Sequence, residues 1–138
     1  MANGVYDTGR NGIMAGTIIF GSVSIKARLV PSSYTPSYGT GTSMTPIGAG
    51  IGTDQTLGTK SVGNDTTTHF SFFKAADPTW TAVAGGSTVA AVVIYKFVTN
   101  DAGSTPLVYL DVTDTATNGG DITIQFASDA NGGIYKIA

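Results

Sequence analysis

Apolar and polar residues alternate most clearly in the segment that begins at Val23. The alternating positions are Val23, Ser24, Ile25, Lys26, Ala27, Arg28 and Leu29. Because successive side chains of a strand point to opposite faces, this pattern predicts a strand with a buried apolar face and a solvated polar face. Pro31 should end the strand, since proline cannot donate a hydrogen bond to a sheet ladder.

Strand signals become dense in the second half of the chain. Residues 88–97, TVAAVVIYKF, are apolar on both faces for most of their length, which predicts the central and most buried strand. Further segments rich in β-branched, aromatic or alternating apolar residues are predicted strands, namely residues 66–73, 78–83, 107–112, 121–127 and 134–137. We expect residues 100–105 to form a turn and the last two strands to form a terminal hairpin across Asn131-Gly132-Gly133. The whole pattern predicts a mainly β fold, a single-domain β-sandwich or small β-barrel.

The N-terminal segment predicts the only helix. Residues 5–15 could form a short helix with Asn3 as its cap, although Gly9 and Gly12 each cost about 1 kcal/mol relative to alanine in a helix. Its expected inward-facing side chains are Val5, Ile13 and Met14.

Residues 32–64 have no sustained period and are rich in Gly, Ser, Thr and Pro. A compact domain rarely holds so long a structureless connection unless it is functional or ordered by a partner, so we expect an extended loop or arm within one domain of residues 1–138. One or two short strands, near residues 44–47 and 57–62 and joined by glycine turns, explain the segment equally well.

Charge is scarce. Only 12% of the 138 residues are charged, whereas globular proteins carry about 25%, and 41% are apolar. A surface made of hydroxyl and amide groups suits a protein that stays packed against neighbours. The net charge of −2 argues against direct binding of nucleic acid, because nucleic-acid binders carry a basic face.

Membrane and secretion signals are not predicted. Crossing a bilayer needs about 20 consecutive apolar residues, which the chain lacks. The apolar stretch of residues 12–21 belongs to the folded domain, since Asp7 lies in the would-be basic region and no clear cleavage site follows.

Catalytic and metal-binding groups are few, so we expect no enzyme, cofactor or bound metal. The chain has no cysteine and a single histidine, His69, which we predict to lie in a strand as a surface or interface residue. Aspartates cluster in the C-terminal third without the spacing of an EF-hand, and turn formation explains them better than Ca²⁺ binding. They are Asp101, Asp111, Asp114, Asp121 and Asp129.

Aromatic residues offer one further possibility. Trp80, Tyr95 and Tyr109 could line a carbohydrate site, since sugars stack on aromatic faces. Because all three lie in predicted strands, we expect them to be core residues instead.

Several segments together resemble a family of small proteins encoded among the virion structural genes of tailed bacteriophages. The segments are MANGVYDTGR, IKARLV followed by YTP, AADPTWTAVAGG, AVVIYKF, STPLVYLD, TNGGDITIQFA and NGGIYKIA. Their order and spacing agree over most of the chain. Residues 39–72 match least, and residues 17–21 read TIIFG where the family often has a more polar, acidic stretch.

The resemblance implies a structural virion protein, made in the host cytoplasm, with no enzymatic role. Within that class we expect a capsid decoration, or cement, protein on the outer surface of the head, whose partners are the major capsid protein and copies of itself. Three-fold lattice positions would favour a trimer. A neck, tail or fibre-attachment component and a carbohydrate-binding module on the virion surface are the alternatives.

On this hypothesis the arm of residues 32–64 supplies the contacts between subunits. Its anchors would be aromatic and large apolar side chains, which are enriched in interface cores. They are Tyr34, Tyr38, Met44, Ile47 and Ile51. Deletion of the arm should then leave a folded domain that no longer binds particles.

Overall fold

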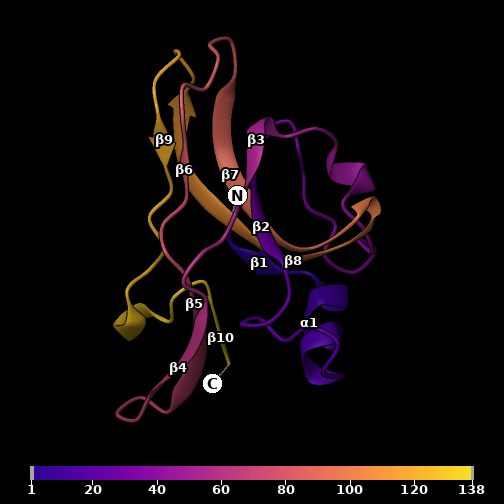
Figure 1. The fold of residues 1–138 in the computed structure, drawn as a ribbon, viewed down its shortest axis with the longest axis vertical. Coiled ribbons are helices and arrows are strands. Elements are labelled where there is room, and N and C mark those ends of the chain that lie inside the picture. Colours follow the sequence, from indigo (N-terminus) through magenta and orange to yellow (C-terminus); the bar gives the residue numbers. More distant parts are fainter. Residues whose placement is uncertain (1, 138) are drawn as a thin grey trace.

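The computed structural model describes residues 2–137 and contains three open antiparallel sheets and one short α-helix (Figure 1). A five-stranded sheet has the order β1-β8-β7-β2-β3, and two small sheets have the orders β10-β5-β4 and β6-β9. The elements are β1 (Gly4–Val5), α1 (Asp7–Met14), β2 (Ile25–Pro31), β3 (Ile51–Thr56), β4 (Ser61–Asp65), β5 (Phe70–Lys74), β6 (Thr79–Trp80), β7 (Thr88–Val98), β8 (Asn100–Ala116), β9 (Ile122–Thr123) and β10 (Tyr135–Ile137), with single 3-10 turns η1 (Thr45–Ile47) and η2 (Asp129–Asn131). The predicted mainly β fold with one short helix is confirmed.

Strand β7 lies inside the large sheet, between β8 and β2, and its residues 89–95 are all buried, which confirms the predicted buried central strand. Its side chains alternate between two apolar clusters on the two faces of the sheet. Val92 and Ile94 point into the first cluster, and Val93 and Tyr95 point into the second. The run is apolar on both faces because both faces of the sheet are covered.

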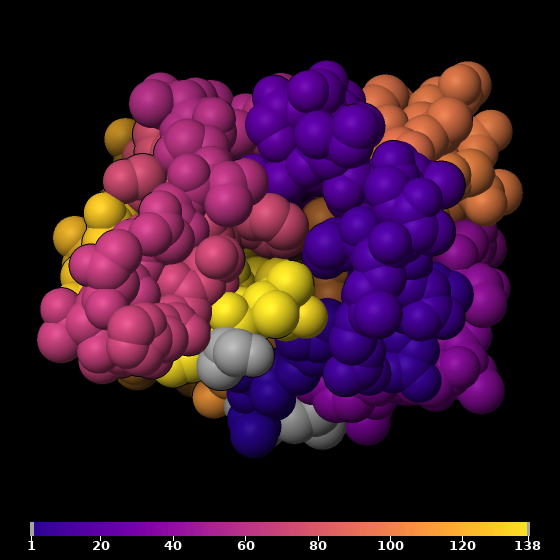
Figure 2. Space-filling model, turned by 90° about the horizontal axis from the view of Figure 1, so that it is seen from below, coloured from indigo at the N-terminus to yellow at the C-terminus, as the bar shows by residue number. Residues whose placement is uncertain are grey.

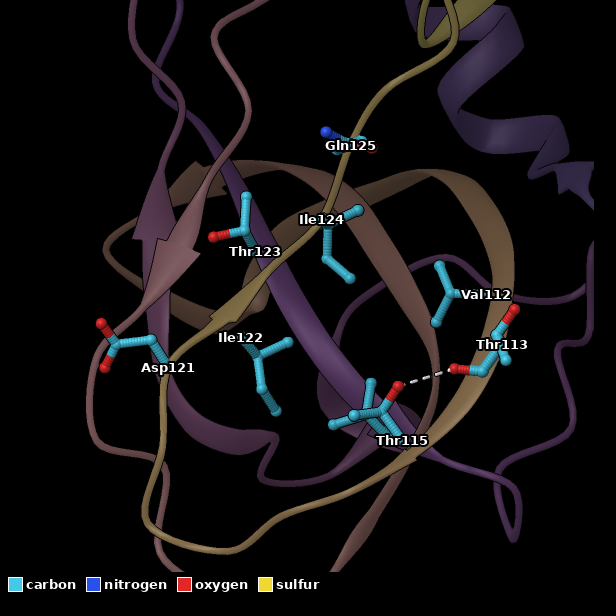
Figure 3. Close-up of a pocket in the computed structure, with 9 residues that line it drawn as sticks. Val112, Thr113, Thr115, Asp121, Ile122, Thr123, Ile124 and Gln125 are labelled. Atoms are coloured by element: carbon cyan, nitrogen blue, oxygen red, sulfur yellow. Dashed lines mark hydrogen bonds between the residues drawn. The ribbon is translucent and has the colours of Figure 1, made fainter.

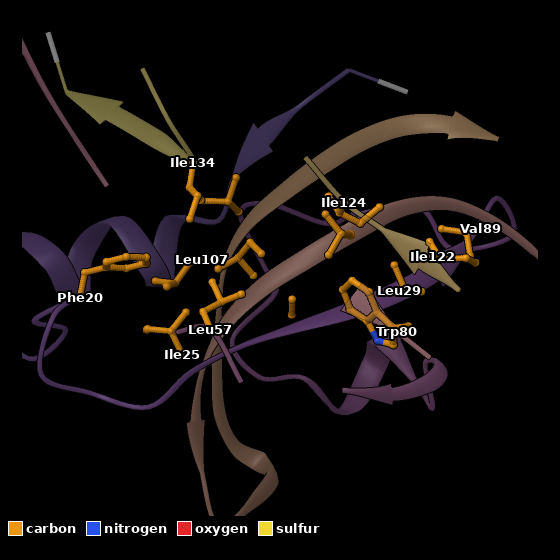
Figure 4. Close-up of a cluster of buried hydrophobic side chains, with 14 of the residues drawn as sticks. Phe20, Ile25, Leu29, Leu57, Trp80, Val89, Leu107, Ile122, Ile124 and Ile134 are labelled. Carbon is orange, nitrogen blue, oxygen red and sulfur yellow. The ribbon is translucent and has the colours of Figure 1, made fainter. Parts of the chain in front are cut away.

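The first cluster fills the space between the large sheet and the segments around β6 and β9 (Figure 4). Trp80, Ile122 and Ile124 enter it from the β6 and β9 side, opposite Leu29 and Val92. The second cluster covers the other face and is closed by residues from outside the sheet. Its buried members are Tyr6, Val30, Met44, Ile47, Ala91, Val93, Tyr95 and Tyr109.

Strand β2 confirms the alternation but corrects the interpretation of its polar face. Ile25, Ala27 and Leu29 are completely buried, as expected. Arg28, predicted to be solvated, is only 6% exposed. The second cluster covers the polar face of β2, so Arg28 is buried although it is charged.

The predicted helix forms as α1, two residues shorter at its start than expected. Val5 instead pairs with Val108 in the sheet, and the Oδ1 atom of Asn3 accepts a hydrogen bond from the Asp111 N–H, so Asn3 is not the cap. Met14, predicted to face inward, is 80% exposed. The helix packs through its other side, where Gly9 is buried against β8.

Residues 32–64 hold more regular structure than an extended loop would. They contain η1, β3 and β4, so the extended loop is not confirmed, and the alternative of short strands describes the segment better. Of the two predicted positions, residues 44–47 hold η1 instead of a strand, and residues 57–62 overlap the start of β4. Strand β3 lies between them and pairs with β2, whereas β4 pairs with β5.

Three further strand predictions are corrected. Residues 66–69 form a turn because the Asp65 carboxylate accepts the N–H groups of Thr67 and Thr68, so β5 begins only at Phe70. Residues 100–105, predicted as a turn, belong to β8. The terminal hairpin does not form, because β9 pairs with β6 and β10 pairs with β5.

Candidate interaction surfaces

One long edge of β8 lacks a strand partner over half its length. β7 pairs with β8 on one side, whereas on the other side β1 pairs only with Val108 and Tyr109. Among the described residues 2–137, no strand pairs with the outer edge of residues 110–116, which faces a hollow instead. An open strand edge is a template for further contacts.

The hollow is a groove between β8 and the segment 121–127, and we call it the β8–β9 groove (Figure 3). It consists of two adjoining parts with volumes of about 540 and 560 Å³ that share Val112, Ile124 and Gln125. Ile122 and Ile124 stand in the gap opposite Val112, which gives the groove an apolar floor. Pairing of β9 with β6 fixes the far wall.

Two aspartates and one lysine, Lys136, line this groove. Asp121 lines one part, Asp111 lines the other, and Asp114 is exposed on β8 between Thr113 and Thr115. Within the part of the chain that the structure describes, neither Asp114 nor Asp121 forms an ion pair with a lysine or arginine; Asp121 accepts the N–H of Ala82. Burial raises the pKa of Tyr109, and the carboxylates of Asp111 and Asp114 raise it further.

A second surface surrounds Tyr34 and Tyr38, and we call it the tyrosine patch, made of these two rings and the exposed hydroxyl residues Ser33, Thr35 and Ser37. Both rings are half-buried and rest on Tyr6, which is fully buried. The hydroxyls of Tyr6 and Tyr34 lie 2.6 Å apart, and the Tyr6 and Tyr38 ring centroids are 5.3 Å apart in an edge-on arrangement. The patch also borders a hollow of about 220 Å³.

The structure brings four of the five predicted anchors together. Tyr34, Tyr38, Met44 and Ile47 all join the second cluster, whereas Ile51 packs against the first cluster from β3. Met44 is fully buried and Ile47 is 8% exposed, so the folded chain itself covers the surface that an anchor would need. The contact role of the two tyrosines stays a prediction.

Sequence reasoning missed a charge network centred on Arg28. Its guanidinium donates to both carboxylate oxygens of Asp101, at 2.8 and 2.9 Å, to Asp54 at 2.7 Å and to the Gly48 carbonyl at 2.8 Å. The Tyr95 hydroxyl donates to the same Asp54 at 2.5 Å. Burial opposes the charge of Arg28, but the hydrogen bonds to Asp101 and Asp54 outweigh it and raise the arginine pKa. No local signal marks these partners, because they lie 26 and 73 residues from Arg28.

Other sequence candidates occupy ordinary positions. His69 is exposed in the turn before β5 with φ of 59°, so its placement in a strand was wrong. Trp80, Tyr95 and Tyr109 are at most 2% exposed, which confirms them as core residues and leaves no ring face for a sugar.

Within residues 2–137, no three His, Cys, Asp or Glu side chains lie close enough to share a metal ion. None of the helices among these residues has the length and hydropathy needed to span a bilayer.

Comparisons with known proteins identify no relative of this chain. No family model, no curated protein and no solved structure matches this chain. Function must therefore be argued from its own residues and surfaces.

Proposed function

We propose that this chain is a structural virion protein of a tailed bacteriophage, a capsid decoration protein that binds the outer surface of the major capsid lattice and stabilises the head. The resemblance of its segments to virion structural proteins supports this class. The observation that carries the proposal is the tyrosine patch, in which Tyr34 and Tyr38 are presented at the surface and already held by Tyr6.

A held aromatic pair is well suited to binding a protein lattice. Tyrosine is enriched in interface cores because it combines a large apolar ring with a hydroxyl group. Since Tyr34 and Tyr38 are fixed before binding, little side-chain entropy is lost on contact. Neutral hydroxyl residues around the rings can form hydrogen bonds with a partner without the cost of burying charge.

Stabilisation of the head would follow from mass action. A protein that binds only the assembled lattice shifts the equilibrium toward assembly, and many copies add up even when each contact is modest. The proposed partners are the major capsid protein and copies of this chain, with a trimer favoured by three-fold lattice positions.

We also infer a β-sandwich-like arrangement for this domain. The large sheet faces β6 and β9 across the first cluster, and this packing supports the inference.

The number of copies of this chain per particle tests whether it lies on the capsid. Quantitative mass spectrometry of purified particles should give a ratio near one copy per major capsid subunit. A small fixed number of copies per particle would instead indicate a neck or tail component, and absence from particles would refute the virion role.

The patch is tested by the double variant Ser33→Glu/Thr35→Glu. Both residues are exposed, so the fold should persist, whereas two buried carboxylates at a contact should weaken binding to particles by roughly tenfold or more. The matched control is Thr66→Glu/Thr67→Glu, two exposed threonines in the β4–β5 turn. Equal binding of both variants would exclude the patch as the contact.

A further inference from the structure

Most open strand edges in residues 2–137 are short or irregular. In β8 the register with β7 shifts within the open half of the strand, and Asn3, from the β1 side, accepts the Asp111 N–H. In β3 the register with β2 shifts in the middle of the strand. Strands β1, β6 and β9 have two residues each, and β10 has three residues with Lys136 at its centre. Bulges, charges and short strands keep sheet edges from pairing with other chains.

The outer edge of β4 lacks these features. All five of its residues, Ser61–Asp65, pair with β5 in one unbroken antiparallel register. Among the described residues no strand pairs with its other side, and η2 lies near β4 without a backbone hydrogen bond to it. Phe72 of β5 lies so close over Gly63 that an added Cβ there would be 2.5 Å from the ring. A cross-strand aromatic ring of this kind stabilises a glycine in an edge strand, so β4 presents a regular open edge.

One face of the β10-β5-β4 sheet is apolar and partly uncovered. The pairing registers place Val62, Phe73 and Tyr135 in one row of this face and Ile137 in the next row. Phe20 stacks on Phe73 with ring centroids 4.6 Å apart and covers the inner part of the face. Val62, on the β4 edge, stays 59% exposed, and Ile137, on the β10 edge, stays 50% exposed. The β4–β5 hairpin projects at the lower end of the molecule in Figure 1 and lies beside the yellow C-terminal residues in Figure 2.

We propose that the outer edge of β4 pairs with the β4 edge of a second copy of the chain, as antiparallel strands related by a two-fold axis at Gly63. The two small sheets then become one continuous sheet, and both copies use the same surface. This inference goes beyond the proposed function and does not depend on it, because the tyrosine patch takes no part in the contact. The contact is two-fold and is therefore separate from the trimer proposed for three-fold lattice positions.

The register of this pairing suits a second copy. With Gly63 opposite its own counterpart, Ser61 lies opposite Asp65 of the second copy, and Val62 lies opposite its Asn64. The only charge of the strand therefore meets a hydroxyl group instead of a like charge, which would be destabilising directly across a strand pair. The two Val62 side chains lie diagonally across the contact on the same face, where they cover each other.

Other occupants of the β4 edge are less favourable. Self-pairing through β10 would place Lys136 against its own counterpart and would use only three residues. A strand of another protein would need the same pattern, a hydroxyl residue opposite Asp65 and an apolar residue beside Val62. A second copy carries this pattern by symmetry.

Sedimentation velocity of the purified full chain over a series of concentrations tests self-association first. The wild type should form a dimer whose proportion rises with concentration. Because backbone hydrogen bonds and apolar contacts make the contact, added salt should change the proportion of dimer little. A wild-type chain that stays monomeric at the highest concentration would overturn the proposal.

Two matched substitutions locate the contact. Val62→Lys places a charge in the middle of the β4 edge, and a lysine on an edge strand opposes pairing, so dimerisation should weaken by roughly tenfold or more. Ile137→Lys makes the same kind of change on the same sheet face but at the β10 edge, and it should dimerise as the wild type does. Both residues are exposed, so circular dichroism should show that both variants are folded. Equal dimerisation of the two variants would overturn the contact through β4.

Disulfide cross-linking tests the register. The chain has no cysteine, so each single variant carries one thiol. In a mixture of Val62→Cys and Asn64→Cys the two thiols lie directly opposite each other, where paired strands hold their Cβ atoms about 4.5–5.5 Å apart. Oxidation should therefore give the mixed disulfide dimer rapidly, whereas a mixture of Val62→Cys and Ile137→Cys should form it far more slowly. Equal rates in the two mixtures would overturn the proposed register.

Discussion

The guanidinium of Arg28 forms a two-point ion pair with the carboxylate of Asp101, with N–O distances of 2.8 and 2.9 Å, across 73 residues of sequence. This contact ties the middle of β2 to the start of β8, next to the bend between β7 and β8. Asp54 on β3 holds the other side of the same guanidinium. Three strands of the large sheet are thus fixed by one buried cation.

Arg28→Met should lower the free energy of unfolding by about 3 kcal/mol, because removal of one partner leaves the largely buried Asp54 carboxylate without its cation. Arg10→Met is the matched control, since the Arg10–Asp7 pair is half-exposed and should contribute at most about 0.5 kcal/mol. Urea denaturation of both variants measures the difference. Similar stabilities for the two variants would contradict the structural role of the network.

Acid should weaken the same network. The hydrogen bonds from Arg28 lower the pKa of Asp101, so this carboxylate stabilises the fold above the usual aspartate pKa, and the contribution is lost as the pH falls through its lowered folded-state pKa. Asp101→Asn should therefore be less stable than the wild type near neutral pH, and the difference should shrink below about pH 4. Thermal unfolding of the wild type and Asp101→Asn across this pH range checks the prediction. A difference in stability between the two proteins that stays constant at all pH values would contradict it.

Gly9→Ala should destabilise the protein by about 2 kcal/mol, although alanine is the better helix former. An added Cβ at Gly9 would lie 2.7 Å from the Leu107 Cα and the Pro106 carbonyl oxygen, and backbone atoms cannot move aside. Gly58→Ala is the control, because nothing lies within 4 Å of its added Cβ. The test is the midpoint of thermal unfolding, and a stabilised Gly9→Ala would mean that α1 does not pack this closely on β8.

Met44→Ala should cost about 3 kcal/mol, because it leaves a cavity in the second cluster at a fully buried position. The loss should appear in chemical denaturation of the isolated chain, with no partner present. A negligible loss of stability would instead support Met44 as an interface anchor.

Deletion of residues 32–64 should unfold the chain, contrary to the expectation that it leaves a folded domain. The deletion removes β3 and β4 together with Met44, Ile47 and Leu57, which are buried in the two clusters. Circular dichroism and proteolysis of the deletion variant decide the matter, and a cooperative, protease-resistant product would show that the segment is dispensable for folding.

Local patterns along the chain were enough to predict the mainly β fold, the position of β2 and the burial of β7. These features follow from local periodicity, because alternation at Ile25, Ala27 and Leu29 and the two-sided apolar run of β7 are properties of neighbouring residues. The single short helix was also predictable, although its cap and its exposed Met14 were not.

Contacts between distant parts of the chain determine which sheet faces are covered and which strand edges stay open. Alternation alone predicted that Arg28 is solvated, because it cannot show that a second cluster covers the polar face of β2. The charge partners of Arg28 are also distant in sequence. Pairing of β9 with β6 and β10 with β5 was likewise hidden, since the turn at Gly132 and Gly133 favoured a local hairpin. The β8–β9 groove forms where these non-local pairings leave residues 110–116 of β8 without a strand on one side. Pairing between distant strands is set by global packing, which local patterns do not encode.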